Sequence, residues 1–159
     1  MIPVVTSIYA ALATILVLVL AGRVVALRRS GKVGLGDGGN ADLAQRIRVH
    51  ANAIENLPLA LFLLLLLELR GIPAPWLHGL GAALLVARVL HAWGFSRRKG
   101  VSFGRFAGTL ATWLLMLLMA AMLLVHSLHG SCGERWAAAP SLRGADAWPA
   151  RSPRLVRCA

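Results

Sequence analysis

Four long apolar segments constrain what this chain can fold into more than any other feature of its sequence. We place them at about residues 4–27, 44–69, 76–96 and 105–128. Each is long enough to cross about 30 Å of hydrocarbon as an α-helix, since a helix rises about 1.5 Å per residue. With 58% hydrophobic and 14% charged residues, the chain is too apolar for a soluble domain. The sequence therefore predicts an all-α fold, an integral membrane four-helix bundle.

The basic residues are placed as membrane topology requires. The formal net charge is +11, yet Lys and Arg cluster beside the apolar segments and in the tail. This distribution favours contact with anionic lipid headgroups and argues against nucleic acid as a partner. The first loop (28–32) and the third loop (97–99) are basic, whereas the second has Arg70 alone. By the positive-inside rule, we expect the first and third loops to be cytoplasmic.

The tail, residues 130–159, differs from the rest of the chain. It holds five Arg and three Pro with little periodicity, and we expect it to be largely disordered or bound to the membrane surface. The two cysteines, Cys132 and Cys158, have no metal-ligand spacing, so no metal site is expected.

Local signals suggest where the second helix begins and where helices approach one another. Asn40 or Asp42 is expected to cap the second helix. Pro58 lies inside it and is expected to kink it. In the third segment, small residues at four-residue spacing predict a close approach by another helix: Gly79, Ala83 and Ala87.

Polar residues form a stripe at the start of the second helix. At about 100° per residue, Arg48, Asn52 and Glu55 fall within about 60° of one another. Asn56 lies just beyond them. Ionised and amide side chains on a helix in lipid are costly unless they face protein, water or a ligand. We therefore treat this stripe as the candidate functional site.

The third segment adds further polar residues near the same membrane face. Arg88 and His91 are one helical turn apart, and Arg97 follows near the end of the segment. Arginines can hold carboxylates through paired hydrogen bonds, amides can bind a peptide backbone, and a carboxylate can bind an amino group. An anionic, peptide-like ligand fits this set, and glutathione offers each of these groups.

These residues occur in two spaced motifs, Arg48-xxx-Asn52-xx-Glu55-Asn56-x-Pro58 and Arg88-xx-His91-xx-Gly94. The pattern resembles the signature of the MAPEG family, the membrane-associated proteins in eicosanoid and glutathione metabolism. The order, spacing and length agree over about residues 1–129, and the likeness is greatest to small bacterial members. The resemblance implies a left-handed bundle assembled as a homotrimer in the bacterial inner membrane. It also implies that glutathione is held between neighbouring subunits near the cytoplasmic face.

The resemblance further implies which residues bind glutathione. Arg48, Asn52 and Glu55 match the family's glutathione-contacting positions. His50 and Asn56 stand where neighbouring ligand contacts occur. The implied activity is transfer of glutathione, as co-substrate, to a lipophilic electrophile that enters from the bilayer.

Two departures from the family pattern concern catalysis. His91 and Phe95 stand where better-known members have tyrosines, and Arg105 is the counterpart of the arginine that activates the glutathione thiol. Glutathione transfer needs the thiol, with a usual pKa of about 8.5, to ionise near a cation or hydrogen-bond donor. Phe95 supplies neither, whereas Arg105, Arg97 or a protonated His91 can. His91 also has a structural interpretation, as a histidine hydrogen-bonded within the bundle.

The polar residues also have structural interpretations. Arg48 and Glu55 can form an ion pair with each other across two turns, and Asn52 can bond to an adjacent helix. Such contacts would stabilise a trimer without any ligand. Arg88 can pair with Glu55 or Glu68 of a neighbouring subunit, because buried charges are commonly retained in such pairs.

Two other functional classes remain open. A small proton-coupled exporter would use Glu55 as its exchange site. Against this, Arg48 lies on the same face and would keep Glu55 ionised. A noncatalytic membrane scaffold, for which the trimer itself is the product, is the third class.

Overall fold

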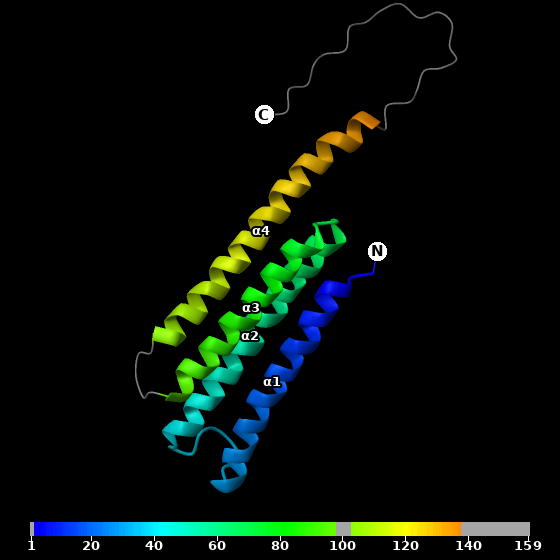
Figure 1. The fold of residues 1–159 in the computed structure, drawn as a ribbon. Coiled ribbons are helices and arrows are strands. Elements are labelled where there is room, and N and C mark those ends of the chain that lie inside the picture. The colour runs from blue at the N-terminus through cyan, green and yellow to red at the C-terminus, as the bar shows by residue number, and fades with distance from the viewer. Residues whose placement is uncertain (1, 98–102, 138–159) are drawn as a thin grey trace, which may run out of the picture. The chain divides into compact units, whose positions relative to one another are not determined.

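The computed structural model describes residues 2–97 and 103–137, except for the side chains of residues 94–97, 103, 105 and 130–137. It contains four helices in sequence (Figure 1): α1 (Val4–Ser30), α2 (Ala41–Leu69), α3 (Ala74–Arg97) and α4 (Phe103–Ala137). No strand occurs among these residues. The predicted all-α fold is confirmed.

Three of these helices are long and apolar enough to cross a membrane within the described part of the chain. They are α1, α2 and the segment Phe106–His129 of α4. The remaining helix, α3, is 24 residues long, but its charged and imidazole side chains lower its hydropathy. A fourth crossing by α3 therefore stays a prediction.

The helices extend beyond the predicted segments at several ends. α1 continues to Ser30, and α2 begins at Ala41. The largest difference is in α4, which continues to Ala137 rather than ending near residue 128. The first residues of the predicted tail are therefore helical. The rest of that tail, residues 138–159, lies outside the described residues.

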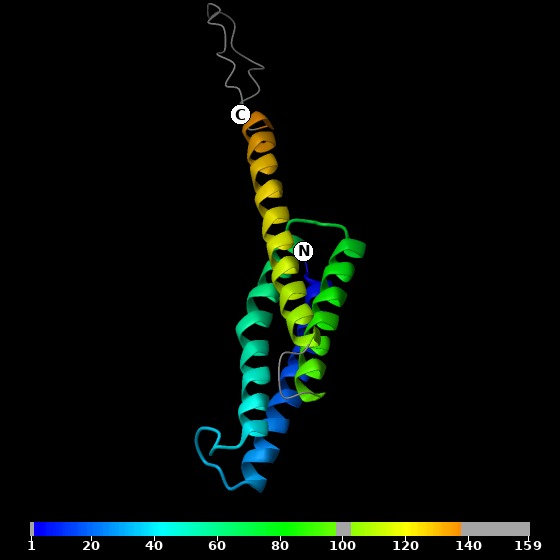
Figure 2. The same ribbon diagram turned by 90° about the vertical axis from the view of Figure 1, so that its left-hand side faces the viewer.

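The chain divides into two compact units, residues 1–123 and 124–159. Within the first unit, α1, α2 and α3 lie side by side and each packs against the other two (Figures 1 and 2). All four helices supply buried side chains to one cluster in this unit, including Ala13, Leu64, Leu84 and Met119. Lipid tails are as apolar as these side chains, so close packing rather than the hydrophobic effect holds the helices together.

The α1–α2 connector and the start of α2 lie at one end of the first unit (Figure 1). Asn40 caps α2, because its side-chain oxygen accepts hydrogen bonds from Asp42 N at 2.9 Å and Leu43 N at 3.2 Å. The choice left open between Asn40 and Asp42 is thereby settled. Gly38 in the connector has a φ of +58°, and a Cβ there would lie 2.8 Å from the Val33 side chain. The connector therefore needs glycine at this position.

A buried carboxylate joins α2 to α1 at the other end. Glu68 accepts hydrogen bonds from Val5 N at 2.8 Å and Thr6 N at 2.7 Å. These amides belong to the first turn of α1, where N–H groups lack partners within the helix and the helix dipole favours an anion. Nearby, the Tyr9 hydroxyl donates to the His78 carbonyl at 2.9 Å. These contacts hold the N-terminal part of α1 against α2 and α3.

Candidate functional site

The predicted residues on α2 differ in exposure. Arg48 and Glu55 are exposed, whereas His50, Asn52 and Asn56 are half-buried. The two amides contact α3 and α4, as described below, while the two charged groups lie on the outer face of the helix. Arg48 and Glu55 thus form the exposed, charged edge of the predicted stripe. Asn52 and Asn56 lie on its other side, against the neighbouring helices.

The structure contains no ion pair between Arg48 and Glu55. Both side chains are described, and neither makes a hydrogen bond or ion pair with any other described residue. The two positions are separated by about 10.5 Å along the helix axis, as seven residues at about 1.5 Å each require. The structural interpretation of this pair as an intrachain ion pair is therefore wrong for the single chain.

Arg88 is almost completely buried, with 2% of its surface exposed. Its Nη1 donates to Asn52 Oδ1 at 2.8 Å, and its Nη2 donates to the Gly108 carbonyl at 3.2 Å. One side chain on α3 therefore connects α2 and α4. A weaker bond joins Nη1 to the Asn52 carbonyl at 3.5 Å. All of these acceptors are uncharged, and Glu68 is occupied with capping α1. Pairing of Arg88 with a carboxylate of another subunit stays a prediction.

The second amide of the stripe also bonds within the chain. Asn56 Nδ2 donates to the Asn52 carbonyl at 2.9 Å, and Asn56 Oδ1 accepts from Trp113 Nε1 at 3.2 Å. Both ends of this amide are used, one within α2 and one on α4. The interpretation of Asn52 as a contact with an adjacent helix is confirmed. The corresponding contact of Asn56 with α4 was not predicted.

A close contact between α3 and α4 places Arg88 within reach of α4. A Cβ built on Gly108 would lie 2.7 Å from the Ala87 carbonyl oxygen and 2.8 Å from His91 N. The Gly108 carbonyl also accepts from Thr112 Oγ1 at 2.8 Å. Gly108 was not predicted as a contact residue, although a glycine in an apolar helix is a signal of close helix packing. Of the small residues predicted on α3, Ala87 makes this contact.

Three more predicted site residues lie on α3 and α4, and the structure describes the side chain of only one of them, His91. His91 is 5% exposed and interacts within the chain, which favours its interpretation as a structural histidine. Arg97 ends α3, and Arg105 belongs to the first turn of α4. Their side chains, and that of Phe95, lie outside the described part. Thiol activation by these residues therefore stays a prediction.

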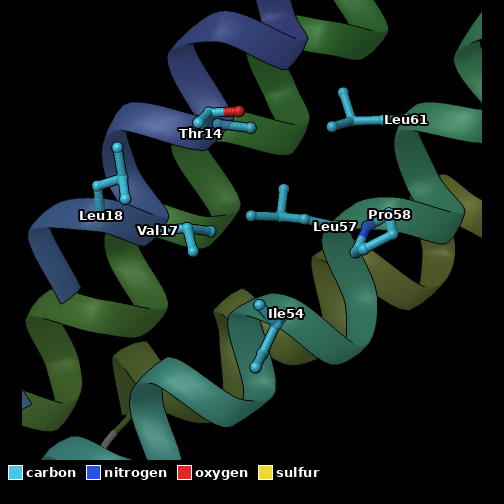
Figure 3. Close-up of a pocket in the computed structure, with 8 residues that line it drawn as sticks. Thr14, Val17, Leu18, Ile54, Leu57, Pro58 and Leu61 are labelled. Atoms are coloured by element: carbon cyan, nitrogen blue, oxygen red, sulfur yellow. The ribbon is translucent and has the colours of Figure 1, made fainter. Parts of the chain in front are cut away.

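A cavity of about 290 Å³ lies between α1 and α2 (Figure 3). Its lining is apolar apart from one threonine: Ala13, Thr14, Val17, Leu18, Ile54, Leu57, Pro58 and Leu61. Its α2 residues lie on average about 120° around the helix from Arg48 and Glu55, with a range of about 60–180°, at about 100° per residue. The cavity is therefore separate from the charged edge. Among the described residues, no three His, Cys, Asp or Glu side chains are grouped to hold a metal ion.

The fold and its buried polar contacts define the class of protein. It is an all-α integral membrane protein, with helices suited to cross a bilayer and a polar region where α2, α3 and α4 meet. A comparison with models of protein families identifies the family. The model described as "MAPEG family" matches residues 6–125, and this chain belongs to the MAPEG family. The resemblance seen in the two motifs is confirmed.

Two curated relatives from Escherichia coli share substantial sequence with this chain. The inner membrane protein YecN of strain K12 is 38% identical over 115 residues, which cover 72% of this chain and 86% of the relative. The protein of the same name from an O6:H1 strain gives the same values. Both relatives are thus inner membrane proteins of similar length to the matched region.

Proposed function

We propose that this MAPEG-family protein binds glutathione, or a similar anionic thiol peptide, along the outer face of α2 through Arg48, Asn52 and Glu55. The observation that carries the proposal is the exposure of Arg48 and Glu55 on a helix that is otherwise largely apolar, without any partner in the described chain. A cation and an anion left open on one helix face can bind the carboxylate and the amino group of one peptide.

The proposed site is completed by a second copy of the chain in a homotrimer. Farther along the same face of α2, Leu59 and Phe62 are also exposed. A neighbouring subunit packed there would bury these side chains and enclose glutathione between the subunits. The charged edge lies in the part of α2 nearest the basic α1–α2 connector. With the first and third loops cytoplasmic and the protein in the inner membrane, the site faces the cytoplasm.

The proposed activity is transfer of glutathione to a lipophilic electrophile that enters from the bilayer. This reaction needs a cation or hydrogen-bond donor to stabilise the thiolate. Arg105 is the proposed catalytic residue, with Arg97 and His91 as the other groups of suitable chemistry. The many exposed apolar side chains of α1 and α4 would give such an electrophile direct access from lipid.

Proton-coupled export is a second candidate, and one observation favours it. Arg48 makes no ion pair with Glu55 in the described chain, so the argument that Arg48 keeps this carboxylate ionised is weakened. An exposed carboxylate without a partner in a membrane helix can serve as a proton-exchange site.

The substitution Glu55→Gln separates the two candidates in proteoliposomes. If glutathione binds through Glu55, its affinity should fall about 10- to 100-fold, which corresponds to one lost charge-assisted hydrogen bond. In an exporter, the same substitution should abolish efflux driven by a pH gradient and leave glutathione without effect. Asp42→Asn is the matched control, since it removes one negative charge from the same helix at its exposed N-terminus.

A further inference from the structure

We infer that Arg88 is a positioning residue that fixes the Asn52 amide so that its NH2 group, rather than its oxygen, is presented to the ligand. This inference rests on the proposed function and deepens it. A guanidinium has five donors and no acceptor, so the Asn52 atom 2.8 Å from Arg88 Nη1 must be the oxygen. Because Arg88 can only donate, the amide oxygen of Asn52 faces Arg88 and its NH2 group faces away.

The NH2 group of Asn52 is left available beside Arg48 and Glu55. Asn52 Nδ2 makes no hydrogen bond to any described residue, and the residue is only half-buried. Arg48 precedes it by four residues and Glu55 follows it by three, so both exposed charges lie within one turn of it. A ligand between these charges would meet a donor at Asn52.

Arg88 is held too firmly to reach the ligand itself. It is 2% exposed, and its two terminal nitrogens are bonded to different helices. Its Nε has no hydrogen-bond partner, and no carboxylate pairs with it among the described residues. The positive charge of Arg88 therefore polarises the Asn52 amide. This polarisation makes the N–H groups of Asn52 stronger hydrogen-bond donors.

The chemistry of the ligand group at this position follows from that polarity. Asn52 should bind a hydrogen-bond acceptor, either a carboxylate or a peptide carbonyl. An ammonium or amide N–H would meet a donor and belongs at Glu55 instead. Arg88 would thus act as a specificity-determining residue without touching the ligand.

The substitution Asn52→Asp tests this inference in the full-length protein. A carboxylate keeps an oxygen for Arg88 and supplies a counter-charge, so the Tm should rise by a few degrees. The donor toward the ligand is lost, so glutathione affinity should fall at least about tenfold. Asn56→Asp is the matched control. It adds the same charge to the same helix, but it places an anion against the Asn52 carbonyl, so the Tm should fall.

A double-mutant cycle on glutathione affinity separates positioning from direct contact. If Arg88 acts through Asn52, then Arg88→Met should weaken binding in the wild type but have no further effect in an Asn52→Ala background. Additive losses would show that Arg88 contacts the ligand and would overturn the inference. If Arg88→Met does not fold, Arg88→Lys takes its place in the cycle.

The results also separate this inference from the proposed function. Wild-type protein that folds but does not bind glutathione would overturn the proposed function, and the donor role of Asn52 with it. Wild-type binding that Asn52→Asp leaves unchanged would overturn the inference alone. A lower Tm in Asn52→Asp than in wild type would contradict the contact on which the positioning depends.

Discussion

Gly108→Ala should separate α3 from α4 and disrupt the contact that buries Arg88. The added methyl would lie 2.7 Å from the Ala87 carbonyl oxygen and 2.8 Å from both Cβ and N of His91. Backbone atoms cannot rotate away as a flexible side chain would. Ordinary contacts begin near 3.4 Å, so this part of α4 has to move by about 0.7 Å.

The expected cost follows from this displacement. Overpacking of this kind costs about 1–3 kcal/mol. The Arg88 Nη2 hydrogen bond to the Gly108 carbonyl is already 3.2 Å long, so the shift should also break it. Removing a bond to a buried charged group adds about 1.5–3 kcal/mol. Alanine recovers about 1 kcal/mol through its higher helix propensity, so the net loss should be about 1.5–5 kcal/mol.

Thermal unfolding in detergent measures this loss. At about 2–4 °C per kcal/mol, the Tm should fall by roughly 3–20 °C. Gly79→Ala is the matched control, because the same substitution on α3 meets nothing within 4 Å and should leave the Tm unchanged or slightly higher. Equal Tm values for Gly108→Ala and Gly79→Ala would refute the close contact between α3 and α4 at Gly108.

Two further predictions concern the helix N-termini. Glu68→Gln should lower the free energy of unfolding by about 1–2 kcal/mol. The substitution removes the charge and one of the two carboxylate oxygens that cap α1, at 2.8 and 2.7 Å. An unchanged Tm in detergent would contradict the capping role. Asn40→Ala should cost about 1 kcal/mol and speed hydrogen exchange in the first turn of α2. Exchange as slow as in wild type would show that Asn40 does not cap this helix.

The helices themselves could be predicted from the sequence because each is marked by a long apolar run. The cap at Asn40 could also be predicted from the sequence, since the residue type and its position before the helix are local signals. The end of α4 was misjudged. Gly130–Ala137 is no longer mainly apolar, but Glu134, Arg135 and Ala137 favour helix, and the helix continues to Ala137. Loss of apolar character was therefore a poor marker of a helix end.

The contacts of the polar residues were only partly predictable. Helical periodicity placed Asn52 on the same face as Arg48 and Glu55. Which of them meets another helix depends on how the helices are rotated against one another, and no local signal sets that rotation. Arg88 bonds Asn52 because the α3–α4 contact at Gly108 brings three helices together. Such contacts depend on tertiary packing between residues far apart in the sequence.

Glutathione binding through Arg48 can be measured by calorimetric titration of glutathione into purified wild-type protein and Arg48→Ala. Arg29→Ala is the matched control, since it removes one exposed charge near the same end of the bundle. We predict saturable binding by wild type and Arg29→Ala, and a loss of binding in Arg48→Ala. Well-folded wild-type protein that binds no glutathione would contradict glutathione as the ligand. Arg48→Ala that binds glutathione as tightly as wild type would contradict the proposed role of Arg48.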